Sequence, residues 1–394
     1  MKKNKNLYMP FLIILAVAIL FLASQIPMVT VEPKDVPIGI VNLDDGEIGI
    51  NIYKNLKENE PKEVMFKSYT SIEKLKESMN DREIYGALVI PQGFTESLLS
   101  LQSAQPDVAT FTIYLNEGHN ATIAPTVEAM LSEVTHKISG QVATDVLTKM
   151  QMSSQTLQEQ IQQQLLQVSV MNEQQIDEIT SFISPIQPEQ VLRLANPIEI
   201  ETVKINKVGK LATVPNALFI SVWISSLLGA VLFYMAGNKR EWATKNERLR
   251  FKLIQAFIPI LYGLFGGYVI AGLSTWILQY EFDSIHKVAL VLAIAITSFV
   301  YLILAALVLI KMPALPIFGI LMFFGLPLIQ LAPEMLPEFY QNYVLPWLPM
   351  RFLIESLKEL LFFNHSIMNS YSIILMSIGG VSLLIIGIKN LATK

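Results

Sequence analysis

Six stretches of the chain are apolar over about 18 residues or more, which is long enough to cross a hydrocarbon core of about 30 Å. They cover residues 8–29, 213–237, 253–280, 288–310, 314–332 and 371–388. Backbone N–H and C=O groups cannot stay unpaired in lipid, so each stretch is expected to form a helix. With 52% hydrophobic and only 16% charged residues, the chain is predicted to be a polytopic α-helical membrane protein with six transmembrane helices.

The charged residues indicate how the chain is oriented. Short cytoplasmic segments carry an excess of Lys and Arg. If the N-terminus is cytoplasmic, the inner segments hold twelve basic and two acidic residues, whereas residues 30–212 hold 14 basic and 25 acidic residues. The opposite orientation would place the basic segments outside. We therefore predict a multi-pass protein of the cell membrane with both termini cytoplasmic and a large extracytoplasmic domain.

The predicted helices divide the chain into three parts. Residues 1–29 are the cytoplasmic N-terminus and the first helix, which is interpreted as an uncleaved anchor because its apolar run exceeds the ~7–15 residues of a signal peptide. Residues 30–212 form the extracytoplasmic domain, and residues 213–394 form a five-helix membrane domain. The chain has no cysteine, which excludes disulfides and thiolate metal sites.

Residues 30–212 alternate strand-like and helix-like runs. The strand-like runs are VPIGIVNL, EVMFKSY, YGALVIP, VATFTIYLN and PIEIETVKI, and the helix-like runs include SIEKLKESM and GFTESLLSLQ. This alternation predicts an α/β fold with a small sheet. From about residue 120 to 180 the sequence turns helical, with an apolar stripe of Leu157, Ile161, Leu165 and Val168, which predicts a helical stalk. The alternative is a partly disordered polar tract.

Glycine and proline indicate how the membrane helices pack. Gly263 and Gly267 form a GxxxG pair, and Gly272 follows. Such small residues let helices approach closely, either within one subunit or between the subunits of a dimer. Pro316 and Pro327 are expected to kink the fifth transmembrane helix.

Residues 350–363 form an amphipathic stretch before the last transmembrane helix. It is too polar to span the membrane, so a helix lying at the outer interface is predicted. Trp347, Tyr340 and Tyr343 precede it and are expected at the level of the headgroups.

The chain lacks the signatures of an enzyme. It contains no GxxxxGK[ST] phosphate-binding loop and no HExxH metal motif, so no catalytic residue, bound metal or cofactor is expected. Asp44, Asp45 and Gly46 are interpreted as a turn after a strand rather than a calcium loop. No apolar stretch carries a charged residue or histidine near its middle, which disfavours an ion-coupled transporter. No nucleic-acid partner is expected.

Three short motifs of the predicted outer domain resemble those of a known family. They contain Asn42, Asp44 and Gly46 of IVNLDDG, Tyr85, Pro91 and Phe94 of YGALVIPQGFTESL, and Asn116 of YLNEGHN. Together with YVLPWLPMRFLIESLKELLF near the C-terminus, these motifs resemble the YhgE/Pip-like (phage infection protein) family of ABC-2 type transporter permeases. The resemblance implies a permease subunit that exports its cargo with a separate ABC ATPase subunit, which uses the ATP. It also implies a homodimer, or a heterodimer with a sister permease, in the lipid bilayer.

The resemblance further implies that residues 238–252, NKREWATKNERLRFK, couple the permease to its ATPase. The residues expected to make this contact are Lys239, Arg240, Glu241, Trp242, Arg248 and Arg250. In the alternative interpretation, the segment is basic only because it faces the cytoplasm. Glu241 and Trp242 lie among the basic residues at helical spacing, which favours coupling.

Two functions of different classes remain open. The first is a permease subunit that moves a lipophilic or amphiphilic compound, a peptide or an envelope component. The second is an envelope receptor or secretion-associated scaffold whose outer domain binds a partner. An ATPase gene beside this one would favour the first.

Overall fold

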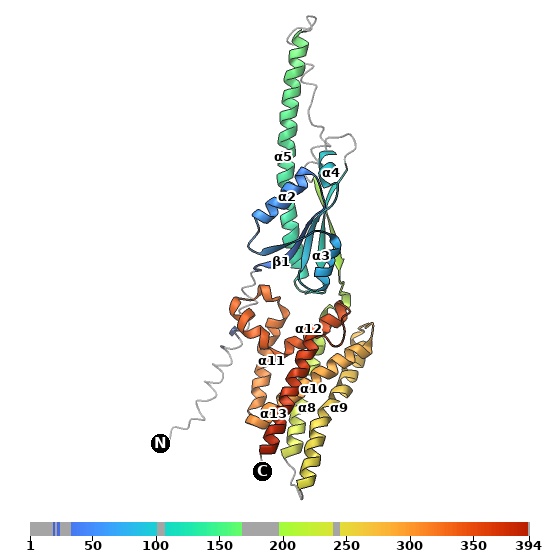
Figure 1. The fold of residues 1–394 in the computed structure, drawn as a ribbon, viewed down its shortest axis with the longest axis vertical. Helices are drawn as coiled ribbons and strands as arrows, with labels where there is room; N and C mark the ends of the chain where they lie inside the picture. Colours follow the sequence, from blue (N-terminus) through green and yellow to red (C-terminus); the bar gives the residue numbers. More distant parts are fainter. Residues whose placement is uncertain are drawn as a thin grey trace, which may run out of the picture. The chain divides into compact units, whose positions relative to one another are not determined.

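A computed structural model describes residues 19, 22–23, 33–100, 107–167, 197–238 and 245–392. The chain divides into two compact units (Figure 1). The sheet unit comprises Asp35–Asn116 and Ala124–Ile205, and the helical unit comprises Met1–Lys34, Glu117–Ile123 and Asn206–Lys394.

The sheet unit contains one mixed, five-stranded sheet in the order β2-β1-β3-β4-β5. Its strands are β1 (Val36–Asn42), β2 (Val64–Tyr69), β3 (Gly86–Ile90), β4 (Ala109–Asn116) and β5 (Ile198–Ile205), and they occupy the five stretches in which the sequence predicts strands. β1 is parallel to β2 and β3, β4 is antiparallel to β3, and β5 is parallel to β4. β1 and β3 are buried on both faces, as expected for central strands with continuous apolar sequences.

Helices cover both faces of this sheet. They are α2 (Glu47–Glu58), α3 (Ile72–Asn80), α4 (Phe94–Ser100) and α5 (Ala124–Gln167). On one face, Leu75 and Met79 of α3 belong to a buried cluster that includes Tyr114 of β4. On the other face, Phe94 of α4 stacks on Phe111 of β4 with ring centroids 4.7 Å apart. Phe111 and Tyr114 point to opposite faces because side chains alternate along a strand.

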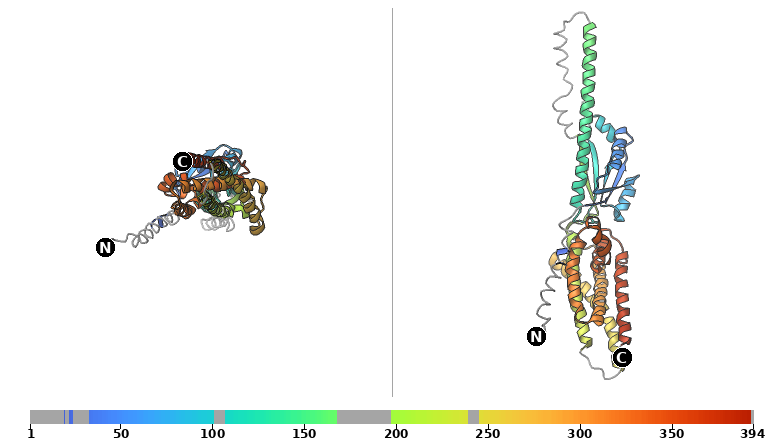
Figure 2. Two further views of the ribbon diagram at one scale, coloured as in Figure 1. Left: turned by 90° about the horizontal axis from the view of Figure 1, so that it is seen from below. Right: turned by 90° about the vertical axis from the view of Figure 1, so that its left-hand side faces the viewer.

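Helix α5 is 44 residues long. Its first turns pack on the sheet through Val127 and Leu131, which are fully buried, and its C-terminal half runs past the sheet (Figures 1 and 2). This half overlaps the first part of the predicted stalk. The side chains of the apolar stripe from Leu157 to Val168, and residues 168–196 as a whole, lie outside the described residues.

Six longer helices make up most of the helical unit. They are α8 (Val214–Asn238), α9 (Lys245–Leu278), α10 (Ile285–Ile310), α11 (Ala314–Gln330), α12 (Pro349–Phe362) and α13 (Ser370–Ala392). The short helices η2 (Gly209–Thr213), η3 (Pro333–Met335), η4 (Tyr340–Val344) and η5 (Leu345–Trp347) accompany them. α10 contacts α8, α9, α11, α12 and α13 and is therefore the central helix.

Four helices among the described residues are long and apolar enough to cross a membrane. They cover Gly209–Gly237, Ala256–Leu278, Ile285–Ile310 and Ser370–Lys389, which is consistent with a polytopic membrane protein. Ala314–Gln330 is also apolar but shorter. Most of the first predicted transmembrane helix, residues 8–29, lies outside the described residues, so the prediction of six spans remains a prediction.

Proline affects α11 less than the sequence suggests. Pro316 lies in the first turn of α11, where backbone N–H groups have no partner within the helix, so it breaks no helical hydrogen bond. Pro327 is the proline inside this helix. Pro316 therefore removes no backbone hydrogen bond whose loss would kink α11.

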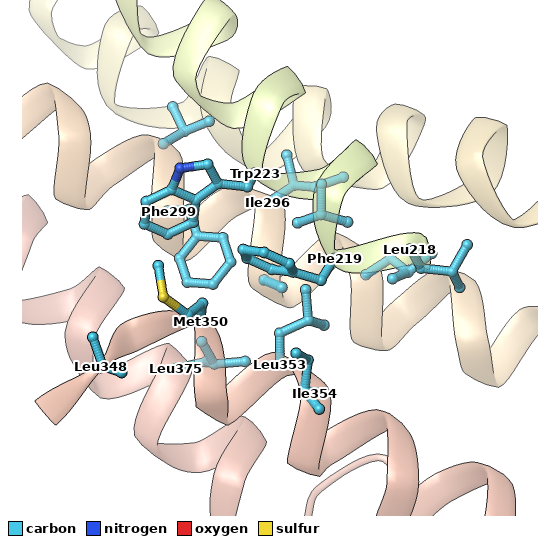
Figure 3. Close-up of a cluster of buried hydrophobic side chains, with 14 of the residues drawn as sticks. Leu218, Phe219, Trp223, Ile296, Phe299, Leu348, Met350, Leu353, Ile354 and Leu375 are labelled. Atoms are coloured by element: carbon cyan, nitrogen blue, oxygen red, sulfur yellow. The ribbon is translucent and has the colours of Figure 1, made fainter. Parts of the chain in front are cut away.

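The core of the helical unit is built around Trp223 of α8 (Figure 3). Its indole packs edge-on to Phe299 of α10, with ring centroids 5.0 Å apart, and the indole N–H has no hydrogen-bond partner among the described residues. Leu353 and Ile354 of α12 are buried in the same core. The amphipathic helix predicted at residues 350–363 thus exists and packs its apolar side inward, while its depth in a bilayer stays a prediction.

The aromatic residues before α12 differ in exposure. Trp347 and Tyr343 are exposed, whereas Tyr340 is buried. The Tyr340 hydroxyl donates a hydrogen bond of 2.7 Å to the carbonyl oxygen of Ala23. Tyr340 therefore contacts protein backbone, and the position of all three aromatic residues at the level of the headgroups stays a prediction.

Candidate functional site

Helix α9 joins the predicted coupling segment to the membrane helices. It contains 34 residues, which makes it about 51 Å long at 1.5 Å per residue, whereas a hydrocarbon core is about 30 Å thick. Its apolar part is Ala256–Leu278. The turns before Ala256 therefore extend beyond the apolar part as one continuous helix.

The predicted coupling residues fall partly on this extension. Arg248 and Arg250 lie in the first turns of α9, and their side chains are outside the described part of the structure. Lys239, Arg240, Glu241 and Trp242 lie in residues 239–244, which are also outside it. Their contact with an ATPase stays a prediction.

Tyr262 attaches α9 to α8. Its hydroxyl donates a 2.8 Å hydrogen bond to the carbonyl oxygen of Ser225, and its ring packs edge-on to Phe233 with centroids 5.5 Å apart. A Cβ on Gly229 would come within 2.7 Å of the Tyr262 ring. The absence of a side chain at Gly229 thus lets the Tyr262 ring pack against α8.

The GxxxG pair attaches α9 to α10. A Cβ on Gly263 would lie 2.7 Å from the carbonyl oxygen of Ala293, and a Cβ on Gly267 would lie 2.9 Å from the Ala293 nitrogen, so both positions require glycine. A Cβ on Gly272 would meet no described atom within 4 Å. Gly263 and Gly267 therefore lie in a contact within one chain, and a role of Gly272 in a dimer stays a prediction.

Pro259 lies inside α9, near the start of its apolar part. A proline inside a helix removes the backbone hydrogen bond to the carbonyl oxygen four residues earlier. Two hydroxyls of α10 donate to carbonyl oxygens at this point, Thr297 to Pro259 at 3.4 Å and Tyr301 to Ala256. Sequence reasoning missed this arrangement, since the partners are 38 and 45 positions apart.

The first outer-domain motif meets the end of the second where the neighbouring parallel strands β1 and β3 end. β1 leads through α2 to β2 on one side, and β3 lies on the other side, so this edge is the topological switch point at which α/β proteins commonly bind ligands. We name the residues Asn42, Asp44, Gly46, Gly49 and Thr95 the switch-point cluster. Asn42 and Asp44 hold the turn after β1 by two mutual hydrogen bonds of 3.0 and 3.1 Å.

Asp44 joins the first motif to the second. Its buried carboxylate accepts hydrogen bonds from the Thr95 N–H, at 3.3 Å, and from the Thr95 hydroxyl. The same hydroxyl accepts the Gly49 N–H at 3.2 Å. A side chain on Gly46 would collide with Thr95. Asp44 thus fixes the loop between β1 and α2 to the start of α4.

Of the other motif residues, Tyr85, Phe94 and Asn116 are buried in the sheet unit and Pro91 is half-buried. The Phe94 N–H donates to the carbonyl oxygen of Pro91 at 3.4 Å. Asn116 donates its side-chain N–H groups to the carbonyl oxygens of Met79 and Ile84, at 2.6 and 3.3 Å, and its backbone N–H to that of Tyr85 at 2.9 Å. These residues shape the fold, and a further role in function stays a prediction.

Little in the described residues points to catalysis. Among them, no group of three or more His, Cys, Asp or Glu side chains is placed to hold a metal ion. Burial, and then the negative charge of Glu201, raise the pKa of the Tyr114 phenol, so Tyr114 stays protonated at neutral pH. The carboxylate of Asp44, in the switch-point cluster, already accepts hydrogen bonds from Thr95.

Comparison with known proteins adds one extensive match. Residues 7–389 of the sequence match the model of the family described as ABC-2 family transporter protein. No curated protein matches the sequence. A solved domain assigned to an ABC type-2 transporter from Thermotoga maritima MSB8 is similar at 17% sequence identity and a TM-score of 0.27, over 43% of this chain and 84% of that one. The family match spans almost the whole chain and is the informative one.

Proposed function

Because the chain belongs to the ABC-2 family of transporter proteins, we propose that it is the permease subunit of an exporter driven by a separate ATPase subunit. The cargo is a lipophilic or amphiphilic compound, a peptide or an envelope component. The apolar helices make the chain a membrane-integral protein. In the proposed arrangement it lies in the cell membrane with both termini cytoplasmic and residues 30–212 outside.

One observation supports this mechanism most. α9 is a single helix from Lys245 through Pro259 into the membrane bundle, where Tyr262 attaches it to α8 and Gly263 and Gly267 attach it to α10. A displacement of its charged end is therefore passed to two neighbouring helices. The carbonyl oxygens around Pro259 stay hydrogen-bonded to α10 at the point where the helix is weakest.

The proposed ATPase contact is tested with substitutions in residues 238–252. Trp242→Ala should abolish ATP hydrolysis that depends on the permease, since truncating an aromatic anchor costs about 2 kcal/mol or more at an interface. The double variant Arg248→Lys, Arg250→Lys should lower this ATP hydrolysis, because Lys keeps the positive charge but lacks the planar guanidinium. The measurement is ATPase activity and vesicle export after co-reconstitution with the ABC ATPase subunit that the proposal requires.

Trp276→Ala is the matched control. Trp276 lies near the other end of α9 and is exposed, so its loss should leave ATP hydrolysis unchanged. If the Trp242 and arginine variants insert, recruit the ATPase and export like the parent protein, residues 238–252 act only as a basic anchor. The coupling mechanism would then be wrong.

The alternative function, an envelope receptor or scaffold, is favoured by one feature of the sheet unit. A groove of about 230 Å³ lies between α2 and α5, with Ile52 and Val142 among its apolar residues and Asn55 and Asp145 among its polar ones. A partner-binding role predicts that Asn55→Trp abolishes biological function without lowering ATP hydrolysis. An exporter whose cargo does not use this groove predicts no effect of that variant.

A further inference from the structure

A second cavity lies in the helical unit, away from α11 and α12. It has a volume of about 360 Å³ and is lined by α9, α10 and α13. Leu264, Ala293, Met376 and Gly380 are typical of its lining, and none of the described residues that line it is charged. The cavity is therefore an apolar groove among helices that are long enough to cross a membrane.

Two features of the sequence produce this groove. α13 contributes the glycine pair Gly379 and Gly380. A Cβ on Gly379 would lie 3.0 Å from the Ser298 hydroxyl, so this glycine lets α13 approach α10, whereas a Cβ on Gly380 would meet no described atom within 4 Å. α9 contributes Ile260 directly after Pro259, where a helix that contains a proline need not stay straight.

The dimensions of the groove limit what can occupy it. The volume falls within the range of small-molecule sites, ~300–1,000 Å³. The Thr297 and Tyr301 hydroxyls at the groove already donate to α9 carbonyl oxygens. A thin, flexible and uncharged occupant fits this lining.

The described part of the first apolar stretch does not supply that occupant. Ala23 accepts its hydrogen bond from Tyr340, which lies in η4 between α11 and α12, and neither of these helices lines the groove. Leu264 and Met376 are partly exposed at the groove, and in a bilayer the medium at such residues is hydrocarbon.

We propose that this groove binds one acyl chain of a bilayer phospholipid, held by α9, α10 and α13 without recognition of the headgroup. The bound chain fills the space that Gly380 leaves open and packs against the segment of α9 that follows Pro259. The site is independent of the proposed coupling to an ATPase, since the lipid is present in every resting membrane.

The test uses the full-length protein in nanodiscs of phosphatidylcholine that contains a diazirine on one acyl chain. After illumination, peptide mass spectrometry should locate the label on Leu264, Met376 and neighbouring groove residues. Gly380→Leu adds a side chain at a groove position where a Cβ meets no described atom, and it should reduce this labelling several-fold. Gly387→Leu is the matched control, because Gly387 is exposed on the same helix, also has open space around it, and does not line the groove.

Three results would overturn the proposal. The first is equal labelling of the groove peptides in the parent, Gly380→Leu and Gly387→Leu proteins while all three melt at the same temperature. The second is a Met376→Cys variant that cross-links to a second copy, which is a clean readout in a chain without cysteine. The third is labelling that requires the ATPase and ATP, which would indicate cargo in transit. Equal labelling by phosphatidylcholine and phosphatidylglycerol probes would support it.

Discussion

At the scale of single residues, Thr95 determines how the loops at the switch point are held. Its hydroxyl donates to the Asp44 carboxylate and accepts the Gly49 N–H, so one oxygen atom satisfies two buried groups. Resemblance to a family marks Asn42, Asp44 and Gly46 as a motif, but only the structure shows that Asp44 and Gly46 both lie against Thr95. A hydrogen bond between positions 51 residues apart leaves no periodic signal in a sequence.

Thr95→Val tests this arrangement, because valine keeps the shape of threonine and removes the hydroxyl. The Gly49 N–H and the Asp44 carboxylate would each lose a partner in a buried site, which costs about 1–3 kcal/mol per group. Denaturant unfolding of a fragment covering residues 31–210 should show this loss. Thr144→Val, on the exposed side of α5, should change stability by about 0.5 kcal/mol or less. Equal effects of the two variants would contradict the assigned role of Thr95.

At the scale of elements, the sequence predicts what is local and misses what depends on packing. The strands are readable because β-branched and apolar runs bounded by turns stand out. The membrane helices are readable because of their length and hydropathy. The contribution of Pro259 cannot be predicted from the sequence. A proline in an apolar helix becomes informative only when Thr297 and Tyr301 are known to lie beside it. The groove likewise requires Gly380 to face open space, which no spacing rule reveals.

Glycine substitutions in α9 separate packing within the chain from contacts between subunits. Gly267→Val would push α9 away from Ala289 and Ala293 of α10, and over-packing typically costs about 1–3 kcal/mol. We expect a lower melting temperature of the detergent-solubilised protein. Gly272→Val should leave the melting temperature unchanged, because that position is open. If Gly272 lies in a dimer contact, chemical cross-linking of two chains should fall in Gly272→Val alone, and an unstable Gly272→Val protein would contradict the description of α9.

At the scale of the whole molecule, the charge pattern and the family agree on a membrane transport component. The short segments predicted to be cytoplasmic carry an excess of basic residues, and the acidic excess lies in residues 30–212. The family match covers residues 7–389, so it includes both the sheet unit and the helical unit. The sidedness of these parts rests on the positive-inside rule.

Single-cysteine labelling can establish that sidedness directly, because the natural chain has no cysteine. A membrane-impermeant maleimide added to intact cells should label Gln141→Cys, an exposed position on α5. It should label Thr244→Cys only after the membrane is opened. Labelling of Thr244→Cys in intact cells would invert the topology and remove the proposed ATPase contact with it.

The position of β5 in the sheet has a consequence for the order of folding. β5 is an edge strand that pairs in parallel with β4, yet residues 117–197 separate the two strands. Closing so long a connection delays pairing, since non-local contacts form slowly, and β4 keeps one unpaired edge until residues 198–205 have left the ribosome. An unpaired edge is a template for adding foreign strands. During biogenesis, completion of the sheet therefore depends on the last strand to be synthesised, and a chain stalled before it would expose a surface prone to aggregation.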